Sequence, residues 1–419
     1  MKFERLHIFE HTAAGRRLLR RNFWLMGLNE FLGGFILYFS ISVLYYAHIT
    51  GSYAQAMMVF SCAAIAAFLF EIPTGILSDT WGRRKTLILG CVFDFAAVFS
   101  FWLAGTLSWE YAYLLLYLGG CFRGLGNALF SGNNYALLYE TARSLKQTHR
   151  IGHILGKTNS MGQLGLVISG IIAFGLIWFG APYHLLYTLT LIPIGLNIAV
   201  AYMVVEPIAI PAGDHYKHRS PFAHFAQSFK YIWHHQDLRT MGIISSLING
   251  LGMAAHDIMP KFISTLWPAW ALPLYRLGQN ALGTLSFWVS GVLVSKFSPF
   301  KSLIIASSCS GVLSLLAFGT SKIFSPFILY LTQVFWAWGQ VAEQSVIQSR
   351  ASAHHRSTIG SVFSFLSNIA IAVFSPLVGL LADCYGIKTA LMIFSVLSIF
   401  IALFYLPFVL KNQGQNSNP

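Results

Sequence analysis

Three ionisable side chains inside long apolar stretches are the residues best placed to do chemistry: Glu30, Asp94 and Arg123. A charged group at membrane depth is costly unless it faces a cavity or a partner, so each is a candidate for function. A carboxylate that feels both burial and a nearby arginine can exchange a proton when its site opens. We therefore expect proton exchange, with Glu30 as the proton carrier, Arg123 as the group that tunes it and Asp94 as a second candidate.

Spacing favours a meeting of Glu30 and Arg123. Glu30 lies about eight residues, or roughly 12 Å of helix, from the start of its apolar stretch, which puts it within reach of Arg123. The alternative is a static ion pair that only satisfies both charges. Arg276 and Asp257 lie near the outer third of neighbouring stretches, where a structural or gating pair is favoured over substrate contact. The residues that could line a substrate cavity are Asn29, Asn133, Asn134, Arg276 and Gln344.

The composition indicates what surrounds these side chains. The chain has 419 residues, of which 56% are hydrophobic and 10% charged, and its mean hydropathy is +0.62. A soluble domain of this composition would have too little polar surface to meet water. A lipid bilayer is therefore the expected solvent. The net charge of +13 is typical of a protein that faces a membrane surface and not of one that binds nucleic acid.

Twelve apolar stretches are long enough to cross about 30 Å of hydrocarbon as helices. Because they are continuously apolar instead of alternating, they predict transmembrane helices and not barrel strands. The expected fold class is an all-α membrane protein with twelve transmembrane helices. The approximate bounds are 23–46, 54–77, 85–105, 110–138, 156–178, 183–205, 239–260, 270–295, 300–319, 324–348, 359–382 and 387–410.

Basic residues set the expected orientation. Most of the 27 Lys and Arg fall in alternate connecting segments, beginning with residues 1–22, whereas Lys261, Lys322 and Lys388 fall on the other side. By the positive-inside rule both termini are then cytoplasmic. The first apolar stretch is too long for the core of a signal peptide, so we expect it to stay in the mature protein.

A polar segment at 206–238 divides the chain. It predicts an N-terminal six-helix half at 1–205, a cytoplasmic linker, and a C-terminal six-helix half at 239–419. Aromatic residues recur at helical spacing within the linker, which predicts an amphipathic helix along the inner membrane face.

Three segments at matching places in the two halves resemble one another: GILSDTWGRRKTLIL (75–89), GVLVSKFSPFKSLII (291–305) and GLLADCYGIKTALMI (379–393). Internal repeats of this kind are typical of duplicated transporter folds. They predict pseudo-symmetric halves with a ligand site between them. For the third segment, the alternative is a chance likeness between apolar helices joined by glycine-rich turns.

The segment GILSDTWGRRK (75–85) concentrates charge in an otherwise apolar chain. Gly75 permits the close approach of two helices, and Asp79 can accept hydrogen bonds from the start of a neighbouring helix. Arg83 and Arg84 can pair with Asp79 or with Glu140 at the inner end of the fourth stretch. This pattern favours a specific contact, because a loop that is basic only for topology needs neither Gly75 nor Asp79.

These residues resemble the cytoplasmic loop motif of the major facilitator superfamily. YLGGCFRGLGNALF (117–130) also resembles the family's fourth-helix motif, in which an arginine beside glycines is associated with proton coupling. The resemblance implies the family fold of twelve helices in two pseudo-symmetric halves, and a secondary transporter that works by alternating access. It also implies a cytoplasmic gate formed by Gly75, Asp79, Gly82, Arg83, Arg84 and Glu140.

Other signals indicate no further chemistry. The five cysteines fall singly and have no metal-ligand spacing. The histidines of 206–238 have no defined ligand geometry, and GHILGKT (152–158) is one residue short of a phosphate loop and follows no strand. We therefore expect no metal, no cofactor and no enzymatic activity.

The resemblance implies a bacterial inner-membrane protein, acting as a monomer, whose partners are a small-molecule substrate, protons and the lipid bilayer. The leading hypothesis is proton-coupled export (efflux) of an amphiphilic compound. The alternative is proton-coupled uptake of a nutrient or siderophore-like compound, and a more distant one is a transporter-like receptor. The segment MGQLGLVISGIIAFG (161–175) has the glycines of the family's export signature but lacks its proline.

Overall fold

The computed structural model describes residues 12–107, 111–207, 229–350 and 356–407. Within these ranges the chain forms helices and no strands. The α-helices before the linker are α2 (Ala13–Gly34), α3 (Ser42–Thr50), α4 (Tyr53–Trp81), α5 (Arg83–Thr106), α6 (Ala112–Phe130), α7 (Asn133–Ser144), α8 (Ile151–Trp178) and α9 (Tyr183–Met203). Those after it are α11 (Gln236–Ser264), α12 (Ala271–Lys296), α13 (Pro299–Thr320), α14 (Ser325–Arg350), α15 (Arg356–Tyr385) and α16 (Ile387–Leu403).

Each predicted transmembrane stretch corresponds to one helix or to two consecutive helices, and two stretches are interrupted. The stretch expected at 23–46 stops at Gly34 and resumes as α3, and the one expected at 110–138 is divided between α6 and α7. Gly132, between α6 and α7, has φ +72°, a conformation that glycine adopts without strain. After Gly34, the Leu37 amide donates to the Thr190 hydroxyl at 3.3 Å, which satisfies part of the broken hydrogen-bond ladder.

Within the part of the chain that the structure describes, six helical segments are long and apolar enough to cross a bilayer, judged by length and composition. The interrupted helices are too short or too polar for the same criterion, and α11, α12 and α14 carry more polar side chains. The six segments are Tyr53–Ser78, Arg83–Thr106, Thr148–Trp178, Tyr183–Met203, Pro299–Thr320 and Val362–Tyr385.

Contacts divide the chain into two compact units. Unit 1 contains Met1–Phe39 and Ile65–Phe222, and unit 2 contains Ser40–Ala64 and Ala223–Pro419. Helix α4 therefore begins in unit 2 and ends in unit 1. The predicted half boundaries stay a prediction. Residues 208–228 of the predicted linker lie outside the described residues, and residues 229–234, at the end of the predicted amphipathic helix, are helical.

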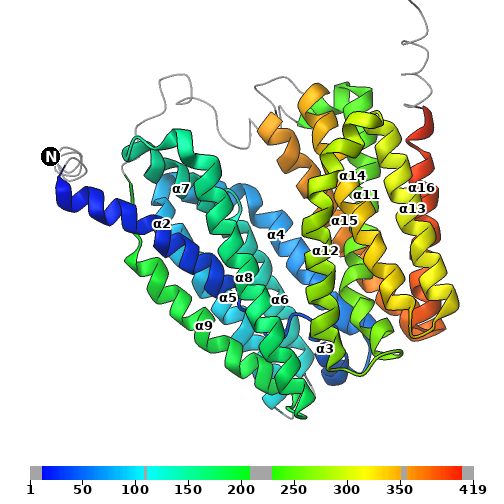
Figure 1. The fold of residues 1–419 in the computed structure, drawn as a ribbon. Coiled ribbons are helices and arrows are strands. Elements are labelled where there is room, and N and C mark those ends of the chain that lie inside the picture. Colours follow the sequence, from blue (N-terminus) through cyan, green and yellow to red (C-terminus); the bar gives the residue numbers. More distant parts are fainter. Residues whose placement is uncertain (1–11, 108–110, 208–228, 351–355, 408–419) are drawn as a thin grey trace, which may run out of the picture. The chain divides into compact units, whose positions relative to one another are not determined.

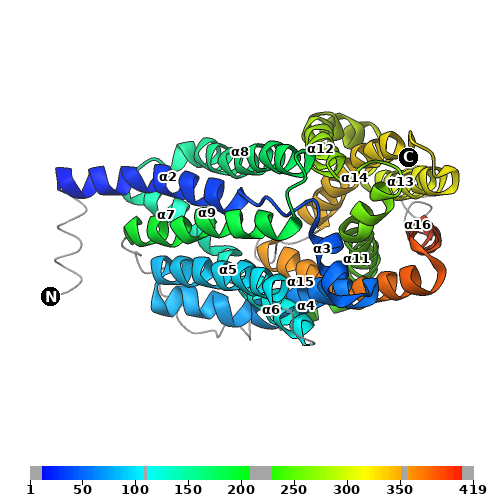
Figure 2. The same cartoon turned by 90° about the horizontal axis from the view of Figure 1, so that it is seen from below.

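Unit 1 is built from closely packed helix pairs. Helix α2 packs against α8 and α9, and α5 packs against α6 and α9 (Figures 1 and 2). A Cβ at Gly165 would lie 2.2 Å from the carbonyl oxygen of Phe31, and one at Gly34 would lie 2.3 Å from that of Gly162. Two helix backbones approach this closely only where side chains are absent. The glycines of α8 therefore have a packing role against α2.

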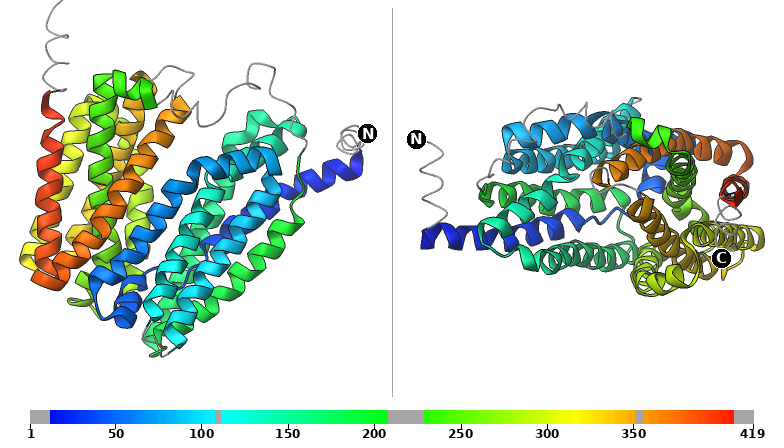
Figure 3. Two further views of the ribbon diagram at one scale, coloured as in Figure 1. Left: turned by 180° about the vertical axis from the view of Figure 1, so that it is seen from behind. Right: turned by 90° about the horizontal axis from the view of Figure 1, so that it is seen from above.

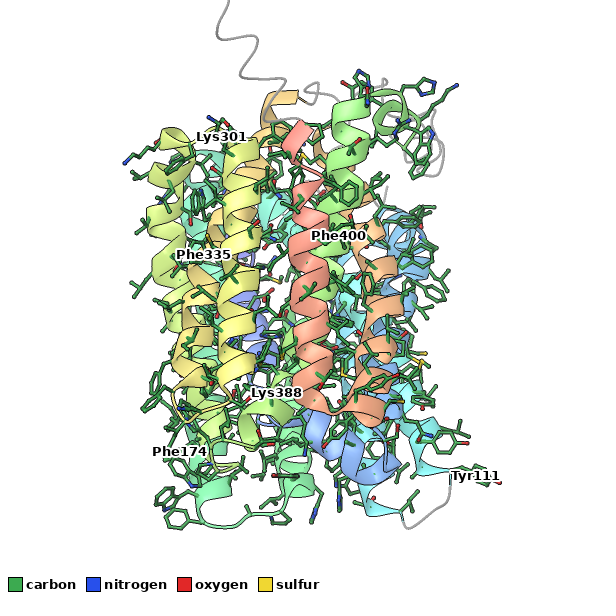
Figure 4. All side chains as sticks on the ribbon, turned by 90° about the vertical axis from the view of Figure 1, so that its right-hand side faces the viewer. Tyr111, Phe174, Lys301, Phe335, Lys388 and Phe400 are labelled. Atoms are coloured by element: carbon green, nitrogen blue, oxygen red, sulfur yellow. The ribbon has the colours of Figure 1, made fainter. Side chains whose placement is uncertain are left out.

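Unit 2 has its own apolar core, which includes Phe300, Phe363 and Tyr405. Helix α13 packs against α14 and α16, and α11 packs against α15 (Figure 3). Figure 4 shows Lys301 and Lys388 at opposite ends of this unit. The Lys388 ammonium group donates to the carbonyl oxygen of Gly319 at 3.0 Å, so the start of α16 lies beside the end of α13.

Candidate functional site

Polar side chains around the junction of α4 and α5 form the Arg83 cluster, which we define as Ser78, Arg83, Arg84, Asn133, Glu140 and Glu206. Arg83 Nε lies 2.9 Å from Glu140 Oε1, which is one of the two pairings that the sequence allows. The Asn133 amide group donates to the carbonyl oxygen of Arg83 at 3.0 Å and accepts from the Ser78 hydroxyl at 2.6 Å. The cluster therefore joins α4, α5 and α7.

Glu206 holds the first turn of α5. Its Oε1 accepts from the Arg83 amide at 2.7 Å, and its Oε2 accepts from the Arg84 amide at 2.8 Å. A carboxylate is favoured there because a helix N-terminus has unsatisfied N–H groups and a partial positive charge. Gly82 has φ +110°, and a Cβ at this position would lie 3.3 Å from both carboxylate oxygens. The positive φ therefore favours glycine at 82, and the Glu206 carboxylate leaves little space for a Cβ there.

The other motif residues have separate surroundings. The side chain of Asp79, for which the sequence predicts a contact with a helix N-terminus, lies outside the described residues. A Cβ at Gly75 would meet no heavy atom of the described residues within 4 Å. The Arg84 guanidinium donates to the carbonyl oxygen of Tyr202 and lies 6.0 Å from the centre of the Tyr202 ring.

Glu30 meets Asn134 where the two interrupted stretches come together. The Asn134 side-chain amide donates to Glu30 Oε1 at 3.1 Å. Glu30 lies near the end of α2 and Asn134 lies in the first turn of α7, so each residue borders an interruption. Interrupted membrane helices expose backbone polar groups and are typical of ligand sites in transporters. Among the described residues, Glu30 has no ion-pair partner.

The ion pair that the structure shows for Arg123 is with Asp94. Arg123 Nη1 lies 2.9 Å from Asp94 Oδ1, and Asp94 is only 5% exposed. A Cβ at Gly126 would lie 2.8 Å from the same carboxylate oxygen, so the glycine leaves room for Asp94 against α6. The sequence predicts that Arg123 reaches Glu30. The structure instead pairs it with the second candidate, because α5 and α6 are adjacent and Gly126 admits the carboxylate between them.

Two of the predicted cavity residues are buried in contacts between helices. Asn29 and Asn133 are each 3% exposed. The Asn29 amide donates to Asn197 Oδ1 at 2.8 Å and lies 3.4 Å from the sulfur of Cys91, which joins α2 to α9 and α5. Asn133 belongs to the Arg83 cluster. Asn134 is half-buried beside Glu30, and Gln344 is exposed on α14.

Arg276 also makes contacts between helices. It is 5% exposed, and its Nη2 donates to the carbonyl oxygen of His256 at 2.8 Å, while its Nη1 donates to Gln279 Oε1 at 3.2 Å. The same guanidinium contacts the His256 ring, whose Nδ1 lies 3.5 Å from Asp257. This arrangement fixes α12 to α11, with His256 between the two charged residues that the sequence paired directly.

Three carboxylates escape the sequence analysis. Glu71 lies near Ser131, at the interruption between α6 and α7, and Glu343 lies near Ser245 in unit 2. Both lie inside predicted apolar stretches, so the criterion that selects Glu30 also selects them. Nothing in the sequence marks Glu206, because its partners are backbone amides.

Comparisons with known proteins now identify the fold. A family model described as the Major Facilitator Superfamily matches residues 23–374. A mutant of the nucleoside transporter NupG has a TM-score of 0.77 and 13% sequence identity, and the match covers 92% of this chain and 99% of that chain. A comparison with curated proteins gave no match.

Two further solved structures have the same architecture. A D-xylose-proton symporter has a TM-score of 0.68 and 14% identity, with 91% of this chain and 96% of that chain covered. The E. coli fucose:proton symporter FucP, also a mutant, has a TM-score of 0.56 and 18% identity, with 94% and 98% covered. At these identities the likeness shows the fold, and the family model shows the family. The predicted all-helical fold and family are confirmed: this chain belongs to the Major Facilitator Superfamily and is a membrane transporter, not an enzyme.

Proposed function

We propose that the protein is a proton-coupled secondary transporter of a small molecule and that Glu30 carries the proton. The observation that supports this proposal best is the hydrogen bond between Glu30 and Asn134, which lies between two interrupted membrane helices. A carboxylate at such a place can meet water and a substrate when the helices move.

The two carboxylates of unit 1 differ in how their charge is compensated. Arg123 lies 2.9 Å from Asp94, so the buried Asp94 carboxyl group has a cation beside it. Asn134 gives Glu30 one neutral hydrogen bond. At membrane depth an ionised carboxylate is costly when a neutral amide is its partner among the described residues, and binding a proton removes that cost. Glu30 is therefore the group that gains and loses a proton, and Arg123 contributes through its pair with Asp94.

The Arg83 cluster has the properties of a gate. Its central pair, Arg83 and Glu140, is partly exposed, with side-chain exposures of 21% and 17%. An ion pair in contact with water contributes little free energy, so it can open and close during a transport cycle. The gate proposal keeps Gly75, Asp79, Gly82, Arg83, Arg84 and Glu140 and adds Glu206.

The direction of transport has two candidates. Export of an amphiphilic compound is the first. For either direction we place the chain in the bacterial inner membrane as a monomer, with both termini cytoplasmic as the basic residues predict. Uptake of a nutrient or siderophore-like compound is the second. Two observations favour uptake. Solved structures with this fold are named as proton symporters. In addition, the packing of Gly162 and Gly165 against α2 accounts for these glycines, so they need not be part of an export motif.

Proton flux in proteoliposomes tests this proposal. The full chain is reconstituted with the pH indicator pyranine inside, and ethidium, uridine, D-xylose or fucose is added on one side under an imposed pH gradient. At least one compound should accelerate proton movement, and the sign of the flux gives the direction. Glu30→Gln should reduce this flux to the level of empty liposomes without removing compound binding, measured by tryptophan fluorescence.

The control is Glu30→Asp, which keeps an ionisable carboxyl group and should retain part of the flux. Asn134→Ala should weaken coupling less than Glu30→Gln, because the carboxyl group remains. Undiminished substrate-driven proton flux in Glu30→Gln would remove Glu30 from the mechanism. A receptor without transport activity would bind a compound and move no protons.

A further inference from the structure

Asp383 forms a second helix cap, at the end of α4 opposite the Arg83 cluster. Its Oδ2 accepts from the Ser52 hydroxyl at 2.6 Å and from the Ala54 amide at 2.9 Å, and its Oδ1 accepts from the Tyr53 amide at 2.9 Å. The two amides are the first backbone donors of α4, which begins at Tyr53, and the Ser52 hydroxyl directly precedes the helix. The carboxylate therefore binds the helix N-terminus through three hydrogen bonds and through the helix dipole.

The backbones meet at the same place. A Cβ at Gly379 would lie 2.4 Å from the carbonyl oxygen of Tyr53 and 2.7 Å from the Ala54 Cα, so α15 contacts the first turn of α4 directly. Farther along α4, the Ser61 hydroxyl donates to the carbonyl oxygen of Ala372 at 2.6 Å. Three contacts in sequence order thus fasten the start of α4 to α15.

The residues of α15 that make this contact belong to a segment whose sequence resembles the charged segment at the junction of α4 and α5. In the third internal repeat, Gly379 and Asp383 stand where Gly75 and Asp79 stand in the first. The turn that follows is the same: a single glycine separates two helices, with φ +110° and ψ 144° at Gly82 and φ +83° and ψ 155° at Gly386. Both turns therefore use a positive φ that glycine adopts without strain.

The segment that Asp383 binds belongs to a part of the chain that groups with a different unit from its sequence neighbours. Residues Ser40–Ala64 group with unit 2, whereas the flanking residues on both sides group with unit 1. Helix α4 continues from this segment into unit 1. Whether the start of α4 stays on α15 therefore decides whether that end of α4 moves with unit 2.

We propose that Asp383 is a positioning residue of the transport cycle: it latches the N-terminus of α4 onto unit 2, and the latch must release as the transporter changes state. Asp383 is exposed, and its partners Ser52, Tyr53 and Ala54 are half-buried. A contact between a solvent-accessible charge and a helix terminus contributes only modestly to stability, so it can break and re-form. The inference rests on the alternating movement of the family and needs neither proton coupling nor a known substrate.

Distances between spin labels test the latch in the full chain. Labels at Gln55→Cys and Tyr385→Cys, both exposed positions, report the separation of α4 and α15 in lipid nanodiscs by double electron–electron resonance. The five native cysteines are replaced by serine. Asp383→Asn should increase the population with separated labels about two- to fivefold, the ratio that corresponds to the loss of one charge at a helix terminus.

Three further variants make the result specific. Asp383→Glu keeps the charge and should restore the original distribution. Ser52→Ala removes one donor and should act in the same direction as Asp383→Asn, which covers the case in which that variant does not fold. Lys388→Gln, a charge change on α16 at the same end of unit 2, should leave the distribution unchanged. Identical distributions in the parent, Asp383→Asn and Ser52→Ala would overturn the latch, whatever the proton-flux assay shows for Glu30.

Discussion

At the scale of single residues, the Asp94–Arg123 pair shows how a membrane helix accommodates charge. The carboxylate is buried, its partner lies 2.9 Å away, and the missing side chain at Gly126 provides the space. A buried pair of this kind adds little net stability, but removing one partner leaves an uncompensated charge. The pair should therefore respond asymmetrically to mutation.

Arg123→Gln should destabilise the protein by about 3–5 kcal/mol, because Asp94 stays buried without its cation. The double variant Asp94→Asn, Arg123→Gln should recover most of that loss, since neither buried charge remains. Unfolding by sodium dodecyl sulfate in mixed micelles measures both free energies. Arg17→Gln, at an exposed position of α2, is the control, and equal stability of this control and Arg123→Gln would contradict the prediction.

The sequence predicts the chemical type of the site better than its pairing. Glu30, Asp94 and Arg123 stand out because they are charged in apolar stretches, and that reasoning applies equally to Glu71 and Glu343. Which carboxylate meets Arg123 depends on adjacent helices and on the space at Gly126, and one sequence does not contain this three-dimensional information. The cap by Glu206 is hidden for the same reason, because any segment can present backbone amides.

At the scale of helices, the length of an apolar stretch predicts a membrane crossing but not its continuity. The stretches at 23–46 and 110–138 have glycines near their interruptions, yet α8 contains several glycines and is continuous. The difference lies in tertiary partners. The Thr190 hydroxyl satisfies an amide after α2, and the left-handed backbone at Gly132 separates α6 from α7. Neither partner nor backbone angle can be read from hydropathy.

The glycines of α8 give a matched prediction. Gly165→Ala places a Cβ 2.2 Å from the Phe31 carbonyl oxygen, so α2 and α8 must move apart, and the variant should lose about 1–3 kcal/mol or more. Gly175→Ala lies in the same helix with no described heavy atom within 4 Å of its Cβ, so it should be neutral or slightly stabilising. The comparison uses the same detergent unfolding measurement. Equal losses in the two variants would contradict backbone contact as the cause.

At the scale of the whole molecule, the division of the chain does not follow its order. The repeats predict two consecutive halves, at 1–205 and 239–419. The contacts nevertheless group Ser40–Ala64 with the C-terminal helices. Sequence repeats show which segments share an ancestor, whereas contacts show which segments are held together in one conformation. In a transporter the contact grouping can differ from the repeat boundaries, because contacts between helices change during the transport cycle.

Cleavage within the linker tests this interleaving. A protease site inserted after Gly213 divides the chain into an N-terminal piece that carries Ser40–Ala64 and a C-terminal piece that carries α11–α16. The pieces should elute together in mild detergent after cleavage, because the whole segment Ser40–Ala64 belongs to unit 2, with α3 packed against α11 and Ser61 hydrogen bonded to α15. Size-exclusion chromatography followed by gel electrophoresis measures the association.

The informative control is the same cleaved chain with Gly379→Leu. Its side chain would begin 2.4 Å from the Tyr53 carbonyl oxygen and would force α15 away from the first turn of α4. The pieces should then separate in a larger fraction of molecules, while the uncut variant still elutes as one folded species. If the parent pieces separate as readily as those of the variant, the contacts of Ser40–Ala64 with the C-terminal helices do not stabilise the association of the two pieces.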